Sequence, residues 1–155
     1  MKHEEHHHHS QAEGYNPSDT KLALSATLHC LVGCGLGEVV GMIIGRGIGM
    51  TNINTIVLAV SLGFVFGFIL GMRPLLKAGY SYRRAIKQVF IAEGLSIAAM
   101  ETAEVLAEVY IPGVMEASLK EPIFWIGMIL ALIAGFLAAF PVNYIMVKRG
   151  IRHQH

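Results

Sequence analysis

Four glutamates recur at helical spacing within one largely apolar stretch of the chain: Glu93, Glu101, Glu104 and Glu108. At about 100° per residue they fall within an arc of roughly 100°, so they share one face of a helix. Near the centre of a bilayer a charged side chain costs about 2.5 to 3.5 kcal/mol unless it faces a partner, water or an ion. We therefore expect a function for Glu93 and Glu101, whereas Glu108 is expected to lie among the outer headgroups.

A second polar face is formed by Cys30, Cys34 and Glu38, which lie four residues apart and within about 80° on a helix, with His29 and Met42 beside them. Thiol and thioether groups favour copper(I), imidazole suits zinc, copper and nickel, and carboxylates suit harder ions. The mixture favours a transition metal, with copper first and zinc or nickel as alternatives. Packing is an open alternative, because cysteine is small and apolar enough for a crowded helix interface.

Two polar layers result if these stretches form parallel helices that rise about 1.5 Å per residue. An inner layer would contain imidazole, thiol and carboxylate groups, and Glu38 would lie level with Glu101 in an outer layer. Crowded carboxylates at low dielectric can also hold protons and exchange them against an ion. The candidate metal ligands are His29, Cys30, Cys34, Glu38, Met42, Glu93, Met100, Glu101 and Glu104.

The elements that must position these residues are membrane helices, because 54% of the residues are hydrophobic and 15% are charged. About 20 apolar residues cross a hydrocarbon core. We expect an all-α polytopic membrane protein, a four-transmembrane-helix bundle within residues 21–150, between a polar tail at 1–20 and a short tail at 151–155. The predicted helices cover residues of about 21–46, 53–72, 84–110 and 122–148.

Lysine and arginine are distributed unevenly between the two ends of such a bundle, and the inner side of a bacterial membrane retains positive charge. The basic residues predicted on one side are Lys2, Lys21, Arg73, Lys77, Arg83, Arg84, Lys87, Lys148, Arg149 and Arg152. Those predicted on the other side are Arg46 and Lys120. This asymmetry predicts cytoplasmic termini and a location in the inner (plasma) membrane.

Glycines recur every fourth residue in the first two predicted helices. They are Gly33, Gly37, Gly41, Gly45, Gly63, Gly67 and Gly71. This spacing forms grooves in which another helix backbone approaches closely, either within one chain or between copies. Because a chain of 155 residues offers little room for a shielded path, we expect a homo-oligomer.

Other features narrow the function. The run His6 to His9 is either an expression tag or a native metal-binding tail, and Asn143, two residues after Pro141, is expected to form a packing hydrogen bond. No phosphate-binding loop, zinc-protease motif or serine with a base beside it is present, so we do not expect an enzyme. Without a basic patch we expect no nucleic-acid partner. Haem or quinone is not expected, since one intramembrane histidine offers haem a single axial ligand per chain.

The sequence therefore predicts a protein of the lipid bilayer that binds and transports a metal cation between its first and third helices. One alternative is a non-transporting assembly protein, whose glycine grooves bind another membrane protein and whose glutamates pair with its basic residues. Another is a bundle that conducts protons or binds a cofactor.

Four segments carry a family resemblance: "HCLVGCGLGEVVGMIIG", "AEGLSIAAME", "EPIFWIGM" and "AAFPVNYIMVKRGIRHQH". With them the chain resembles, from about Ala26 to His155, a family of small prokaryotic membrane proteins called domain of unknown function 4396. The most specific part is Pro141, Val142 and Asn143 followed by a glycine and spaced histidines. The resemblance implies a membrane fold and assigns no function.

Overall fold

The computed structural model describes residues 17–149, and within this range the chain forms four α-helices and no strand. The helices are α1 (Pro17–Gly47), α2 (Asn52–Lys77), α3 (Tyr82–Tyr110) and α4 (Pro122–Lys148). The all-helical prediction is confirmed. Helix α4 has the predicted bounds, whereas α2 continues to Lys77 instead of residue 72. The two predicted tails lie largely outside the described residues, and so do all the tail histidines.

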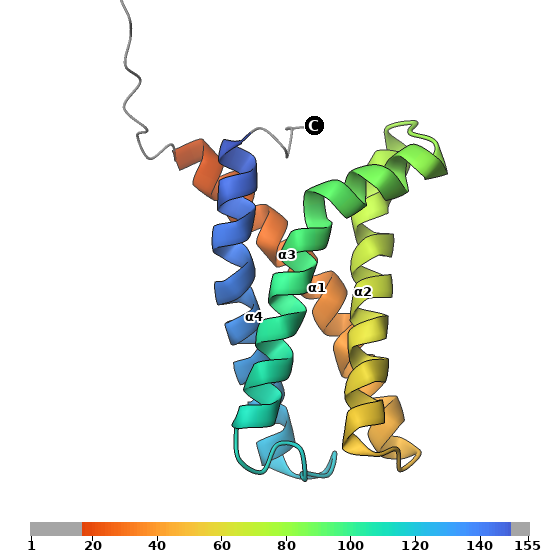
Figure 1. Cartoon of the computed structure of the whole chain (residues 1–155), viewed down its shortest axis with the longest axis vertical. Coiled ribbons are helices and arrows are strands. Elements are labelled where there is room, and N and C mark those ends of the chain that lie inside the picture. The colour runs from red at the N-terminus through yellow and green to blue at the C-terminus, as the bar shows by residue number, and fades with distance from the viewer. Residues whose placement is uncertain (1–16, 150–155) are drawn as a thin grey trace, which may run out of the picture.

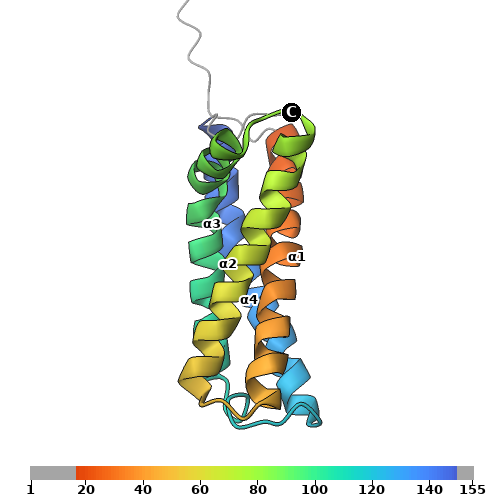
Figure 2. The same cartoon turned by 90° about the vertical axis from the view of Figure 1, so that its right-hand side faces the viewer.

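The helices run up and down in an elongated bundle, with α1 and α3 pointing the same way (Figure 1). The α1–α2 and α3–α4 connections lie together at one end, which we call the loop end (Figure 2). The first turns of α3 lean over α2 at the opposite end (Figure 1), where Ala85 and Val89 pack against Leu75. Farther along, α3 packs against α4. Two parallel helices, α1 and α3, therefore face each other across the interior.

Helices α1 and α2 end in the same C-terminal capping motif. At the end of α1, the Met50 amide donates to the Gly45 carbonyl at 2.8 Å and the Gly49 amide donates to the Arg46 carbonyl at 3.2 Å. At the end of α2, the Tyr80 amide donates to the Leu75 carbonyl at 3.1 Å in the same pattern. This Schellman motif needs a left-handed residue after the helix, and Gly49 (φ 72°) and Gly79 (φ 85°) adopt that conformation.

The glycines of α1 meet α2 of the same chain. A Cβ on Gly33 would lie 3.1 Å from the Cα of Gly67, and one on Gly37 would meet the backbone carbonyl of Leu62. Gly41 lies against Ala59 in the same way. Small residues let backbones approach closely in a bilayer, where the hydrophobic effect does not drive helices together. The first glycine groove is therefore filled within one chain.

The surface of the bundle is apolar, and its interior contains several acidic side chains. Large side chains such as Val32, Phe90, Leu95 and Leu137 are more than 60% exposed, while several glutamates are buried. Helices α1, α2 and α4 are each long and apolar enough to span a membrane. Lipid, and not water, suits such a surface, so the chain is a membrane protein with transmembrane helices.

Candidate metal centre

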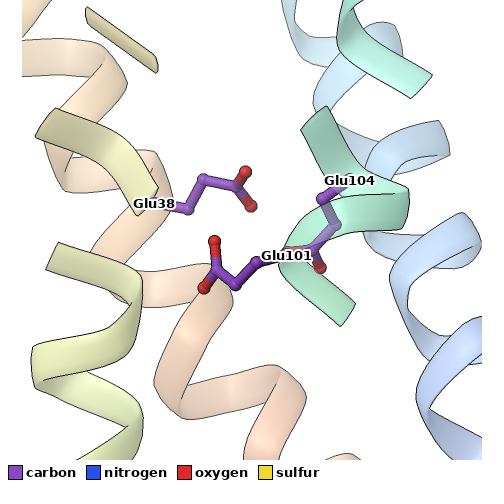
Figure 3. A group of neighbouring side chains, drawn as sticks. All are labelled: Glu38, Glu101 and Glu104. Atoms are coloured by element: carbon purple, nitrogen blue, oxygen red, sulfur yellow. The ribbon is translucent and has the colours of Figure 1, made fainter. Parts of the chain in front are cut away.

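Three carboxylates from two helices converge in the interior of the bundle. Glu38 reaches across from α1 towards Glu101 and Glu104 on α3 (Figure 3). Each residue offers a carboxylate oxygen, and these oxygens all lie within 4.8 Å of one another. All three side chains are at most 3% exposed. We call these three residues the carboxylate cluster, in which Glu38 lies close to Glu101, the residue expected at its level.

The described residues provide no hydrogen-bond donors to the carboxylate cluster. Both oxygens of Glu38, Glu101 and Glu104 are buried without a hydrogen-bond partner in the described part of the chain. An isolated ionised carboxylate in an apolar medium is strongly unfavourable, so such a group binds a cation or holds a proton. Three of them within reach of one another form a donor set that either a metal ion or shared protons would stabilise.

Glycines on the neighbouring helices make room for these carboxylates. The carboxylate of Glu101 lies over Gly63 of α2, and that of Glu104 lies over Gly135 of α4, where a Cβ would collide with either. Glu101 and Glu104 are three residues apart, so they share a face of α3 yet reach two different partner helices. The glycine pattern of α2 thus serves the acidic residues as well as helix packing.

The two cysteines lie next to the carboxylate cluster. Their Sγ atoms are 3.8 Å apart, both are buried free thiols, and they pack with Ile97 and Met100. The thiol of Cys34 occupies the space above Gly67, 2.7 Å from where its Cβ would be. The carboxylate of Glu101 lies over Gly63, one helical turn before Gly67 on α2. Sulfur ligands and carboxylates therefore adjoin in one interior region.

The remaining predicted ligands lie elsewhere. His29 is exposed and lines a surface pocket of about 330 Å³ with Arg73 and Lys77, away from the thiols. Met42 is buried with Phe124 and Met128, in a different cluster from Met100. No imidazole from the described residues joins the carboxylate cluster. The reason is angular, because neighbours in a helix diverge by about 100° and His29 points outward while Cys30 points inward.

Glu93 stands apart from the carboxylate cluster. It lies eight residues before Glu101 on α3, which is about 12 Å along a helix axis. Its carboxylate oxygen is 2.5 Å from where a Cβ on Gly71 would lie, and the side chain is half-buried. Glu93 therefore repeats the glutamate-on-glycine contact nearer the other end of the bundle.

The prediction that Glu108 lies among outer headgroups is wrong. This side chain is 1% exposed, and neither carboxylate oxygen has a hydrogen-bond partner among the described residues. The α3–α4 connection, which follows this turn of α3, is also partly buried, at Val114 and Ala117. Glu108 follows Glu104 by four residues, so the helix face on which it lies was predictable. Its burial inside the bundle was not.

The predicted packing role of Asn143 is supported by its contacts. Its side-chain amide on α4 donates a hydrogen bond of 2.8 Å to the hydroxyl of Thr27 on α1, and that hydroxyl donates to the carbonyl of Ala23. Both side chains are fully buried. The bond joins the first and last helices.

Comparison with known proteins places the chain in a family without assigning a function. No curated protein and no solved structure matches the chain. One family model matches residues 20–152, nearly the whole chain and including every residue of the carboxylate cluster. On that match, the chain belongs to the family described as Domain of unknown function (DUF4396).

Proposed function

We propose that the protein binds a transition-metal cation at the carboxylate cluster and conducts it across the membrane between α1 and α3. The observation that carries this proposal is the set of buried oxygens on Glu38, Glu101 and Glu104 that have no hydrogen-bond partner within the described range. A metal cation among them would compensate a carboxylate charge for which neither the described residues nor lipid supply a hydrogen-bond donor.

The ligand types bear on the identity of the ion. Carboxylates suit manganese and other harder ions, whereas the adjoining Cys30, Cys34 and Met100 would suit copper or zinc. The thiol separation of 3.8 Å fits this use. It is about the edge of a tetrahedron with metal–sulfur bonds of about 2.3 Å. A transition metal that accepts both oxygen and sulfur ligands, copper among them, is the favoured cargo.

The proposal includes a topology. Helix α3 would form the fourth span because its acids point inward while Leu95, Leu106 and other apolar side chains point outward. The excess of lysine and arginine outside the loop end would place both termini in the cytoplasm and the protein in the inner membrane. The cation would then pass from one side to the other along the faces that α1 and α3 turn to each other.

Metal loading of the purified protein tests the proposal. The protein in detergent is incubated with manganese(II), zinc(II), nickel(II) or copper(I), and bound metal is measured by native mass spectrometry. Glu38→Gln and Glu101→Gln each remove a charged ligand with little change of shape, so both should reduce binding about 10- to 100-fold. Cys34→Ser should affect copper and zinc more than manganese.

Controls separate loss of a ligand from loss of the fold. Glu116→Gln removes an exposed acid at the loop end and should leave metal binding unchanged. Each variant must stay monodisperse with an unchanged melting temperature. Metal binding that is equally strong in the wild type, Glu38→Gln and Glu101→Gln would overturn the proposal.

A second candidate function is a non-transporting assembly protein, and one groove favours it. An apolar pocket of about 320 Å³ between α2 and α3 is lined by residues that include Phe64, Val105 and Glu101. A helix from a partner or a second copy that inserted a lysine or arginine there would pair with Glu101. Crosslinking in membranes separates the candidates, because assembly predicts a discrete adduct and metal-free purified protein. Proton flux without bound metal would instead support a proton-conducting bundle.

A further inference from the structure

A surface pocket between α1 and α2 gathers three side chains that carry nitrogen donors. It has a volume of about 330 Å³ and is lined by His29 of α1 together with Leu70, Arg73 and Lys77 of α2. None of these lining residues is acidic, and both Arg73 and Lys77 are exposed. The pocket therefore offers two positive charges and an imidazole to a ligand from outside the chain.

The packing of α1 on α2 fixes the position of this pocket. A Cβ on Gly33 would lie 3.6 Å from the Cβ of Leu70, so the two helices are in contact at this level. His29 lies one turn before Gly33, and Arg73 lies about one turn after Leu70. Beyond this level α1 leans away from α2, towards the end opposite the loop end (Figure 1). The basic side chains thus flank the point at which the two helices begin to separate.

The length of α2 places its basic residues at the membrane surface. No charged residue lies between Asn52, where the helix begins, and Arg73. This stretch of about 20 residues rises about 30 Å, which is the thickness of the hydrocarbon core. Long basic side chains at the end of such a helix extend to the level of the lipid headgroups. Arg73 and Lys77 therefore lie where phosphate groups of phospholipids lie.

We propose that this pocket binds the phosphate group of an anionic phospholipid. The guanidinium of Arg73 would donate two parallel hydrogen bonds to phosphate oxygens, and Lys77 would add a second positive charge. His29 would donate through a ring N–H, which both its neutral and its protonated form possess. Basic pockets between transmembrane helices are known sites for anionic headgroups. The inference does not depend on a bound metal, because none of these residues belongs to the carboxylate cluster.

An apolar surface beside the pocket favours a lipid over free phosphate. Val32 follows His29 by three residues, and Ile69 precedes Arg73 by four, so each lies on the same helix face as its basic neighbour and nearer the membrane centre. Val32 is 61% exposed and Ile69 is 49% exposed. Acyl chains joined to the bound phosphate would cover these side chains, whereas inorganic phosphate gains nothing from them.

Native mass spectrometry of the full-length protein, stripped of lipid in detergent, tests the inference. The protein is titrated with phosphatidylglycerol or with phosphatidylcholine of the same acyl chains. The first lipid adduct should form about fivefold more tightly with phosphatidylglycerol, because the choline group cancels the phosphate charge. Arg73→Gln and Lys77→Gln should each weaken phosphatidylglycerol binding about fivefold, and together about 25-fold if the two charges act independently.

The matched control removes two charges at the same end of the bundle but outside the pocket. Arg83 and Arg84 are exposed in the first turn of α3, and the double variant Arg83→Gln, Arg84→Gln should leave phosphatidylglycerol affinity unchanged. Exchange of the two cations, Arg73→Lys with Lys77→Arg, should retain the preference for phosphatidylglycerol. If the double glutamine variant at Arg73 and Lys77 does not remain monodisperse, the two single variants carry the same prediction.

Three results would overturn the inference. Unchanged phosphatidylglycerol affinity after removal of both pocket charges would reject the site, and so would equal weakening by the control variant, which would indicate a general attraction of charge. Equal affinities of the wild type for the two lipids would reject recognition of the anionic headgroup. Inorganic phosphate in the millimolar range should not displace the lipid. Displacement by phosphate, but not by chloride at equal ionic strength, would reassign the pocket to free phosphate.

Discussion

The carboxylate of Glu101 lies against the backbone of Gly63, in the space that a methyl group on this residue would occupy. The next glycine of the α2 series, Gly67, receives the thiol of Cys34, and Gly71 receives the carboxylate of Glu93. A spacing that normally indicates close helix packing therefore also makes room for polar groups from α1 and α3. The polar interior exists because α2 presents almost no side chains to it along this line.

Gly63→Ala is expected to weaken metal binding while leaving the fold largely intact. The new methyl group would collide with the end of the Glu101 side chain, which is flexible and can turn away. Moving one ligand oxygen out of the carboxylate cluster should reduce affinity about tenfold. Titration with manganese(II) and a thermal unfolding curve, recorded on the same preparation, measure both quantities.

Gly94→Ala is the control for this variant, because nothing lies within 4 Å of a Cβ at Gly94 in α3. It should leave affinity unchanged and stabilise the helix by up to about 1 kcal/mol. Equal manganese affinities for Gly63→Ala and the wild type would show that the position of the Glu101 carboxylate does not matter for binding.

Gly37→Ala is expected to lower the stability of the fold, in contrast to Gly63→Ala. Its methyl group would meet the main-chain carbonyl of Leu62, which does not rotate away, so α1 and α2 would have to separate. Overpacking of this kind costs about 1 to 3 kcal/mol of stability. A melting temperature that equals that of the wild type in detergent would contradict the close α1–α2 contact.

Periodicity predicted the acidic face of α3, the thiol face of α1 and the level at which Glu38 meets Glu101. These relations depend on helical geometry, which is nearly independent of context. Burial at a helix end depends on the tertiary packing around it, so a helical wheel did not predict that Glu108 is only 1% exposed.

The sequence also did not predict which side chains contact which glycines. The spacing of Gly63, Gly67 and Gly71 predicts a groove but not its occupant, which is set by the rotation of α3 about its own axis. Met42 and Met100 satisfy the same periodic pattern, yet they pack in different clusters, Met42 with Phe124 and Met128 and Met100 with the two thiols.

Metal affinity should fall as the solution becomes more acidic. Carboxylate ligands bind a metal ion only after losing their protons, so protons compete for the same oxygens of Glu38, Glu101 and Glu104. Affinity for manganese(II) should therefore decrease between pH of about 8 and about 6, and binding should release protons into weakly buffered solution. Glu104→Gln should make this dependence shallower, whereas affinity that is constant over this range would show that the carboxylates hold no protons when the metal is absent.

The orientation of the bundle predicts which serines are accessible from outside the cell. Ser118 lies in the α3–α4 connection and Ser81 in the α2–α3 connection, and both are exposed. In a background where Cys30 and Cys34 are replaced by serine, Ser118→Cys should react with a membrane-impermeant thiol reagent on intact cells. Ser81→Cys should react only after the membrane is permeabilised, because the basic residues of its connection favour the cytoplasmic side. The reverse pattern would invert the bundle, and labelling of both cysteines on intact cells would show that α3 does not cross the membrane.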